Sequence, residues 1–213
     1  MDSLDKHTDY GSVALDEADL RPDPLDQFAL WLTDAERAGI YEPNAMVVST
    51  VDSSSRPSSR TVLLKGLRHD GFEFVTNYRS VKGVQLAENP AISLLFPWYS
   101  IHRQVIVLGS ATPASTETSD AHFAARPRES QLASMASAQS TAIGSRAELE
   151  QKVAELTEKF ATVDVIPRPS WWGAVLVVPR SIEFWQGRSS RLHDRFCYSS
   201  DRAGGWTVQR LQP

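Results

Sequence analysis

The feature that most constrains the fold of this chain is a series of short β-type segments separated by turn-forming clusters. Apolar and β-branched residues dominate five runs, at residues 45–51, 61–67, 72–77, 92–96 and 104–110. Clusters of small and polar residues at 52–55 and 69–71 separate the first three of them. Strands that follow one another at such close spacing predict a β-barrel or a β-sandwich.

Helical segments precede and interrupt these strands. Asp23-Pro24 supplies an N-cap and a first-turn proline to an apolar stripe that ends at Gly39. Further helices are predicted at 80–88, 115–125 and 128–136, and one opens on the capping box at 145–148. Strands return at 174–178, 182–186, 192–198 and 206–210. We therefore expect a mainly β fold with helical insertions (α+β), formed by a single domain over residues 23–213 behind a polar, mobile N-terminal arm over residues 1–22.

The composition of the chain restricts its partners. It has 213 residues, a formal net charge of −4 and no apolar window long enough to span a membrane, and its first ten residues lack the apolar core of a signal peptide. We expect a cytoplasmic protein that binds neither membrane nor nucleic acid, because nucleic-acid recognition requires a basic patch. The single cysteine, Cys197, excludes an intramolecular disulfide and a cysteine-cluster metal site, so no metal is expected.

The segment 182–196 combines a β-type pattern with a concentration of basic and aromatic side chains. The strand reaches a turn at Gly187 and returns, so Arg191, His193 and Arg195 are predicted to project from one face at a period of two. Three such groups on one face repel one another unless an anion lies opposite them. The alternative interpretation is a solvated edge of a hairpin.

Two other segments carry cations that suit a small anionic ligand. Arg60 and Lys65 lie at the two ends of an apolar strand, and their odd spacing directs them to opposite faces. Two exposed cations on an edge strand would give the same pattern. Ser80 and Lys82 begin a helix whose free amide groups can hold a phosphate, although ordinary N-capping by Ser80 explains part of this pattern.

Polar groups in two further segments suggest ligand contacts. Gln104 opens an apolar strand, where it could bind the polar edge of a planar heterocycle or a neighbouring backbone group. His122 and Arg126 lie four residues apart on a predicted helical face, with Ser130 one turn further on. Histidine, arginine and a hydroxyl together suit a phosphate monoester, whereas a solvated cationic face is the simpler interpretation.

Taken in chain order, these segments resemble the pyridoxamine 5′-phosphate oxidase family of flavin enzymes. The matching motifs extend over nearly the whole chain. They are Asp23-Pro24, Glu42-Pro43-Asn44-Ala45-Met46, Arg60 to Lys65, Thr76-Asn77, Ser93 to Trp98, Arg103-Gln104-Val105, Arg126-Pro127-Arg128, Ser130-Gln131, Gln139-Ser140, Trp172-Gly173, Glu183 to Gly187, Arg191 to Arg195 and Arg210 to Pro213. The resemblance implies a split β-barrel homodimer that holds flavin mononucleotide (FMN) at the subunit interface.

The resemblance also implies roles for individual residues. Those implied to bind FMN are Arg60, Thr61, Val62, Leu63, Leu64, Lys65, Val75, Thr76, Lys82, Gln104, Gln139, Ser140, Trp185 and Arg195. Those implied to bind the substrate are Lys65, His122, Arg126 and Ser130 at its phosphate, with Tyr10, Arg191 and His193 over its ring. Arg191 and His193 are the implied catalytic residues, and His193 is assigned to positioning first, with acid/base work as a hypothesis.

The implied reaction converts pyridoxamine or pyridoxine 5′-phosphate to pyridoxal 5′-phosphate, with dioxygen as electron acceptor and hydrogen peroxide released. Four motifs depart from the family pattern. An Arg-x-x-Tyr motif reads His7-Thr8-Asp9-Tyr10, a tyrosine is His122, an Arg-Lys pair is Val81-Lys82, and a Gly-Ala-Trp motif is Ala133-Ser134-Met135. Two alternatives stay open: a phenazine-biosynthesis flavin oxidase that acts on a reduced tricyclic precursor, and a non-catalytic split-barrel protein that binds flavin or pyridoxal phosphate.

Overall fold

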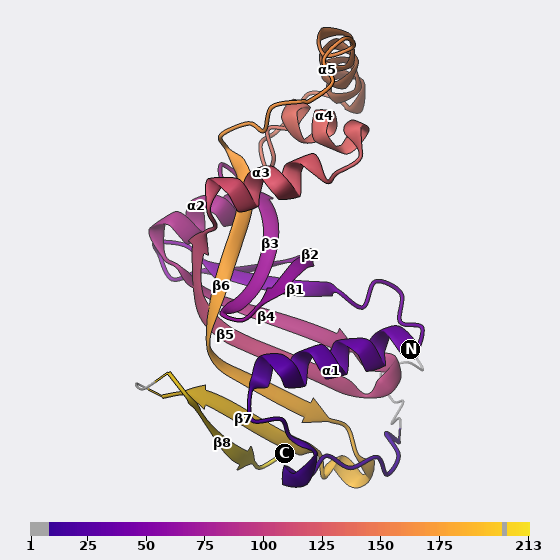
Figure 1. The fold of residues 1–213 in the computed structure, drawn as a ribbon, viewed down its shortest axis with the longest axis vertical. Helices are drawn as coiled ribbons and strands as arrows, with labels where there is room; N and C mark the ends of the chain where they lie inside the picture. Colours follow the sequence, from indigo (N-terminus) through magenta and orange to yellow (C-terminus); the bar gives the residue numbers. More distant parts are fainter. Residues whose placement is uncertain (1–8, 202–203) are drawn as a thin grey trace.

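Six antiparallel strands close into a barrel in the computed structural model, which describes residues 9–201 and 204–213 (Figure 1). Their order around the barrel is β3-β2-β1-β4-β5-β6, and a pairing between β3 and β6 completes the ring. The six are β1 (Ala45–Val51), β2 (Pro57–Arg68), β3 (Gly71–Asn77), β4 (Ala91–Trp98), β5 (Arg103–Pro113) and β6 (Trp172–Gln186). The predicted β-rich fold with helical insertions is confirmed.

Strand β6 is long enough to belong to two parts of the sheet. Its first half pairs with β3 in the barrel, and its last residues pair with β7 (Asp194–Ser200), which in turn pairs with β8 (Trp206–Leu211). The sequence predicted two separate strands here, at 174–178 and 182–186, on either side of Pro179. The chain stays extended through it because the register against β5 shifts between Leu108 and Gly109, and proline is tolerated at such irregularities.

In the described part of the chain, five α-helices accompany the barrel, and three of them gather at one end of it (Figure 1). They are α1 (Pro24–Arg37), α2 (Val81–Glu88), α3 (Thr116–Ala124), α4 (Arg128–Ala136) and α5 (Arg146–Lys159). The predicted caps are present, since the side chains of Asp23, Ser80 and Ser145 each accept a hydrogen bond from a backbone N–H of the first turn. Within the described ranges, no helix has the length and apolar character that crossing a membrane requires.

Aromatic side chains fill the main core between α1 and the barrel. Phe28 of α1 meets Phe72 and Phe96 edge-on, with ring centroids 4.9 and 4.7 Å apart, and Trp98 lies beside them. A second, smaller cluster lies under α3 and α4 and contains Phe123, Leu132, Ile166 and Trp172. This cluster ties the helical end to the start of β6, which is where the cavity described below opens.

The described part of the predicted arm lies against the C-terminal strands. Leu15 is buried, and its N–H donates to a carboxylate oxygen of Asp194 at 3.1 Å. The Tyr198 hydroxyl donates to the carbonyl oxygen of Arg21 at 2.7 Å. Residues 9–22 therefore have specific contacts with β7, while residues 1–8, and with them His7, lie outside the described residues.

Candidate functional site

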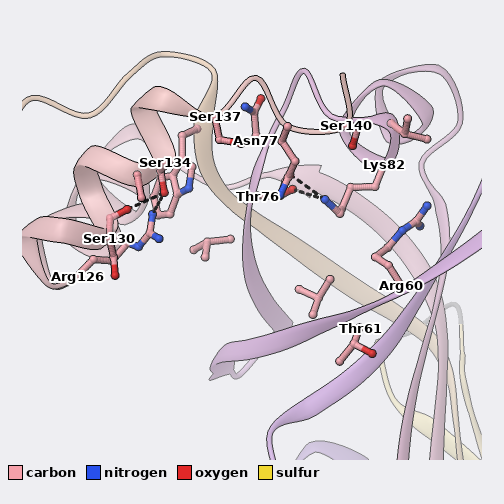
Figure 2. A pocket seen from close by; sticks show the side chains of 16 residues that line it. Arg60, Thr61, Thr76, Asn77, Lys82, Arg126, Ser130, Ser134, Ser137 and Ser140 are labelled. Carbon is pink, nitrogen blue, oxygen red and sulfur yellow. Dashed lines mark hydrogen bonds between the residues drawn. The ribbon is translucent and has the colours of Figure 1, made fainter. Parts of the chain in front are cut away.

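A cavity of about 690 Å³ opens between the barrel wall and the helical end of the molecule (Figure 2). Strands β2 and β3, the start of α2, helix α4 and the segment after it contribute its walls. Its lining residues are Arg60, Thr61, Val62, Val75, Thr76, Asn77, Val81, Lys82, Arg126, Ser130, Ala133, Ser134, Ser137, Gln139, Ser140 and Trp172. Three of them are cationic and, among the described residues that line it, none is acidic. The cavity thus suits an anionic ligand.

Arg60 and Lys82 form one cationic end of the cavity. The Arg60 guanidinium donates to the hydroxyls of Thr50 and Ser58, at 2.7 and 2.6 Å, and Lys82 Nζ donates to Gln139 Oε1 at 3.0 Å. These partners are neutral. Burial lowers the pKa of both cations, and the nearby charge of Arg60 lowers the pKa of Lys82 further. Two partly desolvated cations with neutral partners would both be stabilised by a phosphate group.

The first turn of α2 explains how Lys82 is held in place. Ser80 caps the helix by accepting from the Gly83 N–H, and its hydroxyl oxygen also lies 3.3 Å from Lys82 Nζ. Thr76 Oγ1, at the end of β3, accepts from the same ammonium at 3.2 Å. The cavity therefore contains the helix start and the lysine that the sequence predicted to hold a phosphate.

Arg126 and Ser130 form the other polar side of the cavity (Figure 2). Arg126 lies on the short connection between α3 and α4, and its guanidinium carbon is 5.0 Å from the centroid of the Trp172 ring. Burial lowers the pKa of Arg126. The structure thus brings Arg60, Lys82, Gln139 and Ser140, predicted for the cofactor, into one cavity with Arg126 and Ser130, predicted for the substrate.

His122 and Lys65 do not line this cavity. The helix α3 ends at Ala124, so His122 and Arg126 do not share a helical face as predicted. His122 Nε2 instead lies 3.3 Å from Oε2 of Glu73, a buried carboxylate that also accepts from Arg68 at 3.1 Å. Lys65 is exposed at a β-bulge, because the pairing of β2 with β3 shifts register between Leu64 and Gly66. Leu63 and Leu64 precede it on β2.

A second group of predicted site residues lies at the far end of β6. The rings of Tyr10, Trp185 and His193 form a cluster, with centroids 4.7 Å apart for Trp185 and His193 and 5.7 Å apart for Tyr10 and His193. Gln104, on β5, is paired with Trp185. The predicted alternation of three side chains on one strand is wrong, because β7 begins only at Asp194. Arg191 instead ends a short 3₁₀ turn, η3 (Ser189–Arg191), with φ of 60°.

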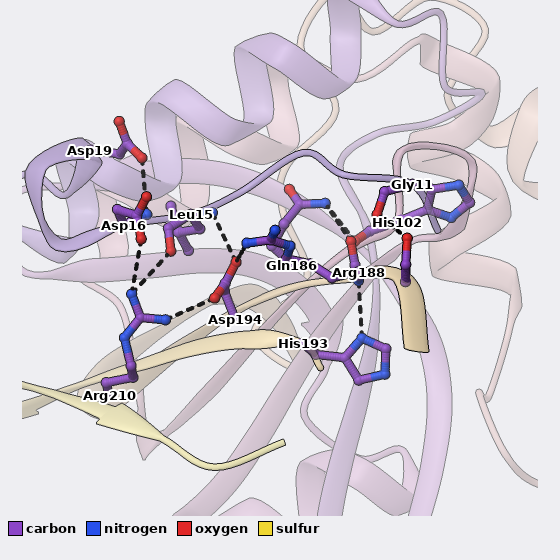
Figure 3. Close-up of polar contacts among 12 residues, drawn as sticks. Gly11, Leu15, Asp16, Asp19, His102, Gln186, Arg188, His193, Asp194 and Arg210 are labelled. Carbon is purple, nitrogen blue, oxygen red and sulfur yellow. Dashed lines mark hydrogen bonds and ion pairs between the residues drawn. The ribbon is translucent and has the colours of Figure 1, made fainter. Parts of the chain in front are cut away.

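Anionic partners compensate for the cations of this C-terminal hairpin. Arg195 donates to both carboxylate oxygens of Glu183, at 2.8 and 3.0 Å, which raises the pKa of the guanidinium. The Asp194 carboxylate accepts from Arg188 and Arg210 (Figure 3). The hairpin is therefore a structured ion-pair network and not a bare cationic edge.

The tautomer of the neutral His193 ring follows from its hydrogen bond with the backbone N–H of Arg188. The Arg188 N–H donates to His193 Nδ1 at 3.1 Å, so the neutral ring carries its proton on Nε2 (Figure 3). Burial lowers the pKa of His193, and the charge of Arg191 lowers it further against a weaker opposing effect of Asp194. His193 is thus suited to donate a hydrogen bond from Nε2 at neutral pH.

Strand β6 separates the two groups of residues within one chain. Trp172 in the cavity and Trp185 in the aromatic cluster lie thirteen positions apart on this strand, a contour length of roughly 40 Å. Residues that reasoning from the sequence missed include Glu73, Ser134 and Asp194. Glu73 and Asp194 contact residues that are distant in the sequence, so no local pattern indicates these contacts. For Ser134 a local signal exists, because it follows Ser130 by one turn of α4.

Together, the closed six-stranded barrel, its C-terminal strand extension and the cationic cavity define a split-barrel protein of the kind that binds an anionic ligand. Residues 32–160 match the family model described as pyridoxamine 5′-phosphate oxidase, and residues 172–213 match the one described as pyridoxine 5′-phosphate oxidase C-terminal dimerisation region. The chain belongs to the pyridoxamine 5′-phosphate oxidase family, and it is a flavin oxidase of that family.

Individual relatives agree with this assignment over nearly their full lengths. The chain is 48% identical to the pyridoxine/pyridoxamine 5′-phosphate oxidase of Thermobifida fusca, over 100% of this chain and 98% of the relative. It is 50% identical to the protein of the same name from Rubrobacter xylanophilus, over 96% and 94% of the two chains.

Solved structures agree on the fold. PhzG from Burkholderia lata, in complex with tetrahydrophenazine-1-carboxylic acid, superposes with a TM-score of 0.89 at 31% identity, covering 96% of this chain and all of that one. A pyridoxamine 5′-phosphate oxidase-related, FMN-binding protein from Nostoc punctiforme superposes with a TM-score of 0.73 at 17% identity, covering 91% of this chain and all of that one. The predicted split barrel is confirmed.

Proposed function

We propose that this protein is an FMN-dependent oxidase that converts pyridoxamine or pyridoxine 5′-phosphate to pyridoxal 5′-phosphate. Dioxygen would be the electron acceptor and hydrogen peroxide the second product. The observation that carries the proposal is that one cavity contains two separate cationic groups, one at Arg60 and Lys82 and one at Arg126. Two phosphate-bearing molecules, a flavin mononucleotide and a phosphorylated substrate, would each find one of these groups.

The residues of the cavity fit the polar end of FMN. Arg60 and Lys82 would neutralise its phosphate, while Gln139 and Ser140 would bind the phosphate or the ribityl hydroxyls. Thr61, Val62, Val75 and Thr76 also line the cavity, and backbone groups of 61–64 and 75–76 would contact the flavin. Gln104, Trp185 and Arg195 would contact the isoalloxazine ring. Because they lie at the other end of β6, we assign them to the partner subunit of a homodimer whose interface holds the flavin.

The substrate would bind beside the flavin through its own phosphate. Arg126 and Ser130 would bind this group from within the cavity, joined by Lys65 and His122, which do not line it. Tyr10, Arg191 and His193 would reach the pyridine ring from the partner's hairpin. Because Tyr10 lies against Trp185, the arm would cover the substrate and exclude water from it.

When bound, FMN would supply the redox chemistry, taking a hydride equivalent from the carbon that bears the amine or hydroxyl group and passing electrons to dioxygen. The protein would orient that carbon over the flavin and place cations against the phosphate. His193 would donate a hydrogen bond from Nε2, because the Arg188 N–H already occupies Nδ1. Arg191 would contact the substrate ring as the second catalytic residue.

Purified protein would test this proposal. Release of hydrogen peroxide that depends on pyridoxine 5′-phosphate or pyridoxamine 5′-phosphate, from yellow protein with flavin absorption bands, is the expected result. Colourless protein that does not take up FMN would refute it. Flavin-loaded protein that binds pyridoxal phosphate without any turnover would support a carrier instead.

The likeness to PhzG supports one other function in the same class. That protein is described in complex with a tetrahydrophenazine carboxylic acid, and this chain has Met135 where the family resemblance implies a large aromatic residue. An oxidase for such a tricyclic compound would have no need of Arg126 and Ser130 as a second phosphate site. Turnover of a reduced phenazine precursor, together with no turnover of either B6 phosphate, would select this alternative.

A further inference from the structure

We propose that Ser134 is a positioning residue for the substrate phosphate, because it holds the Arg126 guanidinium in the cavity. The inference rests on the proposed function and adds a residue that the family resemblance does not assign. The family motif that the sequence resembles reads Gly-Ala-Trp, and this chain has Ala133-Ser134-Met135 in its place.

The geometry places Ser134 next to Arg126. Arg126 follows α3, and Ser134 lies on α4, two positions before the helix ends. Nη1 of Arg126 donates a hydrogen bond to Ser134 Oγ (Figure 2). Both residues line the cavity, and Ser130, one turn earlier on α4, lines it as well.

The direction of each hydrogen bond makes Ser134 an acceptor for Arg126. A serine hydroxyl has one proton, and here Ser134 Oγ donates it to the carbonyl oxygen of Ser130 at 2.9 Å. The lone pairs of the oxygen are therefore free to accept from the guanidinium. An alanine at position 134 would leave Nη1 without this acceptor.

Two more contacts hold the arginine from other sides. The guanidinium lies over the Trp172 ring, and Gln131 Nε2 donates to the backbone carbonyl oxygen of Arg126 at 3.1 Å. Since a guanidinium has five N–H donors and Ser134 accepts only one of them, several stay free for phosphate oxygens. The side chain is thus ordered before the substrate arrives, which removes part of the entropy cost of binding.

The test compares Ser134→Ala and Ser134→Thr in flavin-loaded protein. Ser134→Ala should raise the KM for pyridoxine 5′-phosphate and the Kd for pyridoxal 5′-phosphate by about threefold to tenfold, the usual effect of ordering one long side chain. The kcat and the affinity for FMN should stay within about twofold of the wild type, since Arg126 belongs to the substrate side. Ser134→Thr keeps the hydroxyl and should restore both constants.

Thr157→Ala is the matched control. It removes a hydroxyl that also donates to a carbonyl one helical turn earlier, at Val153 on α5, outside the cavity. It should leave KM and Kd unchanged. Equal constants for wild type and Ser134→Ala, or a Ser134→Thr variant as weak as Ser134→Ala, would overturn the inference.

The design separates the inference from the proposed function. A wild-type protein that binds pyridoxal 5′-phosphate but turns over neither B6 phosphate would refute the proposed oxidase, while the Kd comparison would still decide the role of Ser134. A wild-type protein that binds no phosphorylated pyridoxal compound would overturn both.

Discussion

Replacing Asp194 should loosen the N-terminal arm and destabilise the C-terminal strands. The Asp194 carboxylate is buried and accepts three hydrogen bonds, from the Leu15 N–H at 3.1 Å, from Arg188 at 3.1 Å and from Arg210 at 2.8 Å (Figure 3). In Asp194→Ala, the buried Leu15 N–H loses its acceptor, which costs about 1–3 kcal/mol. Each of the two partly exposed ion pairs contributes about 0.5–1 kcal/mol. The free energy of unfolding should therefore fall by about 2–5 kcal/mol.

Urea denaturation at one fixed protein concentration would measure this loss, because association of subunits makes apparent stability depend on concentration. Glu17→Gln is the matched control, since Glu17 pairs with the same Arg210 but has a side chain that is 68% exposed. It should have a much smaller effect. Limited proteolysis should also cut residues 9–22 faster in Asp194→Ala. A loss for Asp194→Ala no larger than that for Glu17→Gln would refute the reasoning.

The pH dependence supplies a second readout of the same carboxylate. Burial alone would raise the pKa of Asp194, but hydrogen bonds from the Leu15 N–H, Arg188 and Arg210 outweigh it and bring the pKa below 3.8. A group whose pKa is lower in the folded state stabilises it above the unfolded pKa, and this contribution is lost as the pH falls through the folded value. The difference between wild type and Asp194→Ala should therefore be constant near neutral pH and shrink below about pH 3.8.

Two further substitutions test the cofactor end of the cavity. Val81→Arg adds a third cation to the end formed by Arg60 and Lys82 and should tighten FMN binding by about tenfold in a flavin-fluorescence titration, the usual size of one charge-assisted hydrogen bond. Val84→Arg, at an exposed position on the same helix outside the cavity lining, is its control, and equal tightening by both would contradict the expected contact. Gly83→Ala should lower the free energy of unfolding by about 1–3 kcal/mol, because its methyl group would overlap the Tyr78 carbonyl oxygen. An unchanged melting temperature would show that α2 shifts freely.

Local sequence signals predicted most of the elements correctly. The caps at Asp23, Ser80 and Ser145 locate three helix starts, since each depends on residues within one turn. The errors occurred where a distant segment decides the outcome. The break predicted between residues 178 and 182 is absent because the pairing with β5 shifts register there, and β7 starts late because Ser190 and Arg191 both have positive φ.

In the candidate site too, local signals predicted residues correctly and contacts between distant segments were not predicted. Arg60, Lys82, Arg126 and Ser130 were predicted from motifs, and the fold brings them into one cavity. The contact of His122 with Glu73 could not be predicted, because the two residues are 49 positions apart and a histidine four residues before an arginine suggests a shared helical face. The role of His122 at the substrate phosphate stays a prediction.

The span of β6 has a consequence for mixed dimers. If each site combines the cavity of one chain with the hairpin of its partner, then Lys82→Met and His193→Ala inactivate different halves of it. A dimer that contains one chain of each kind has one site in which both defects meet and one site in which neither occurs. Refolding the two inactive variants together in equal amounts should therefore restore about a quarter of the wild-type activity.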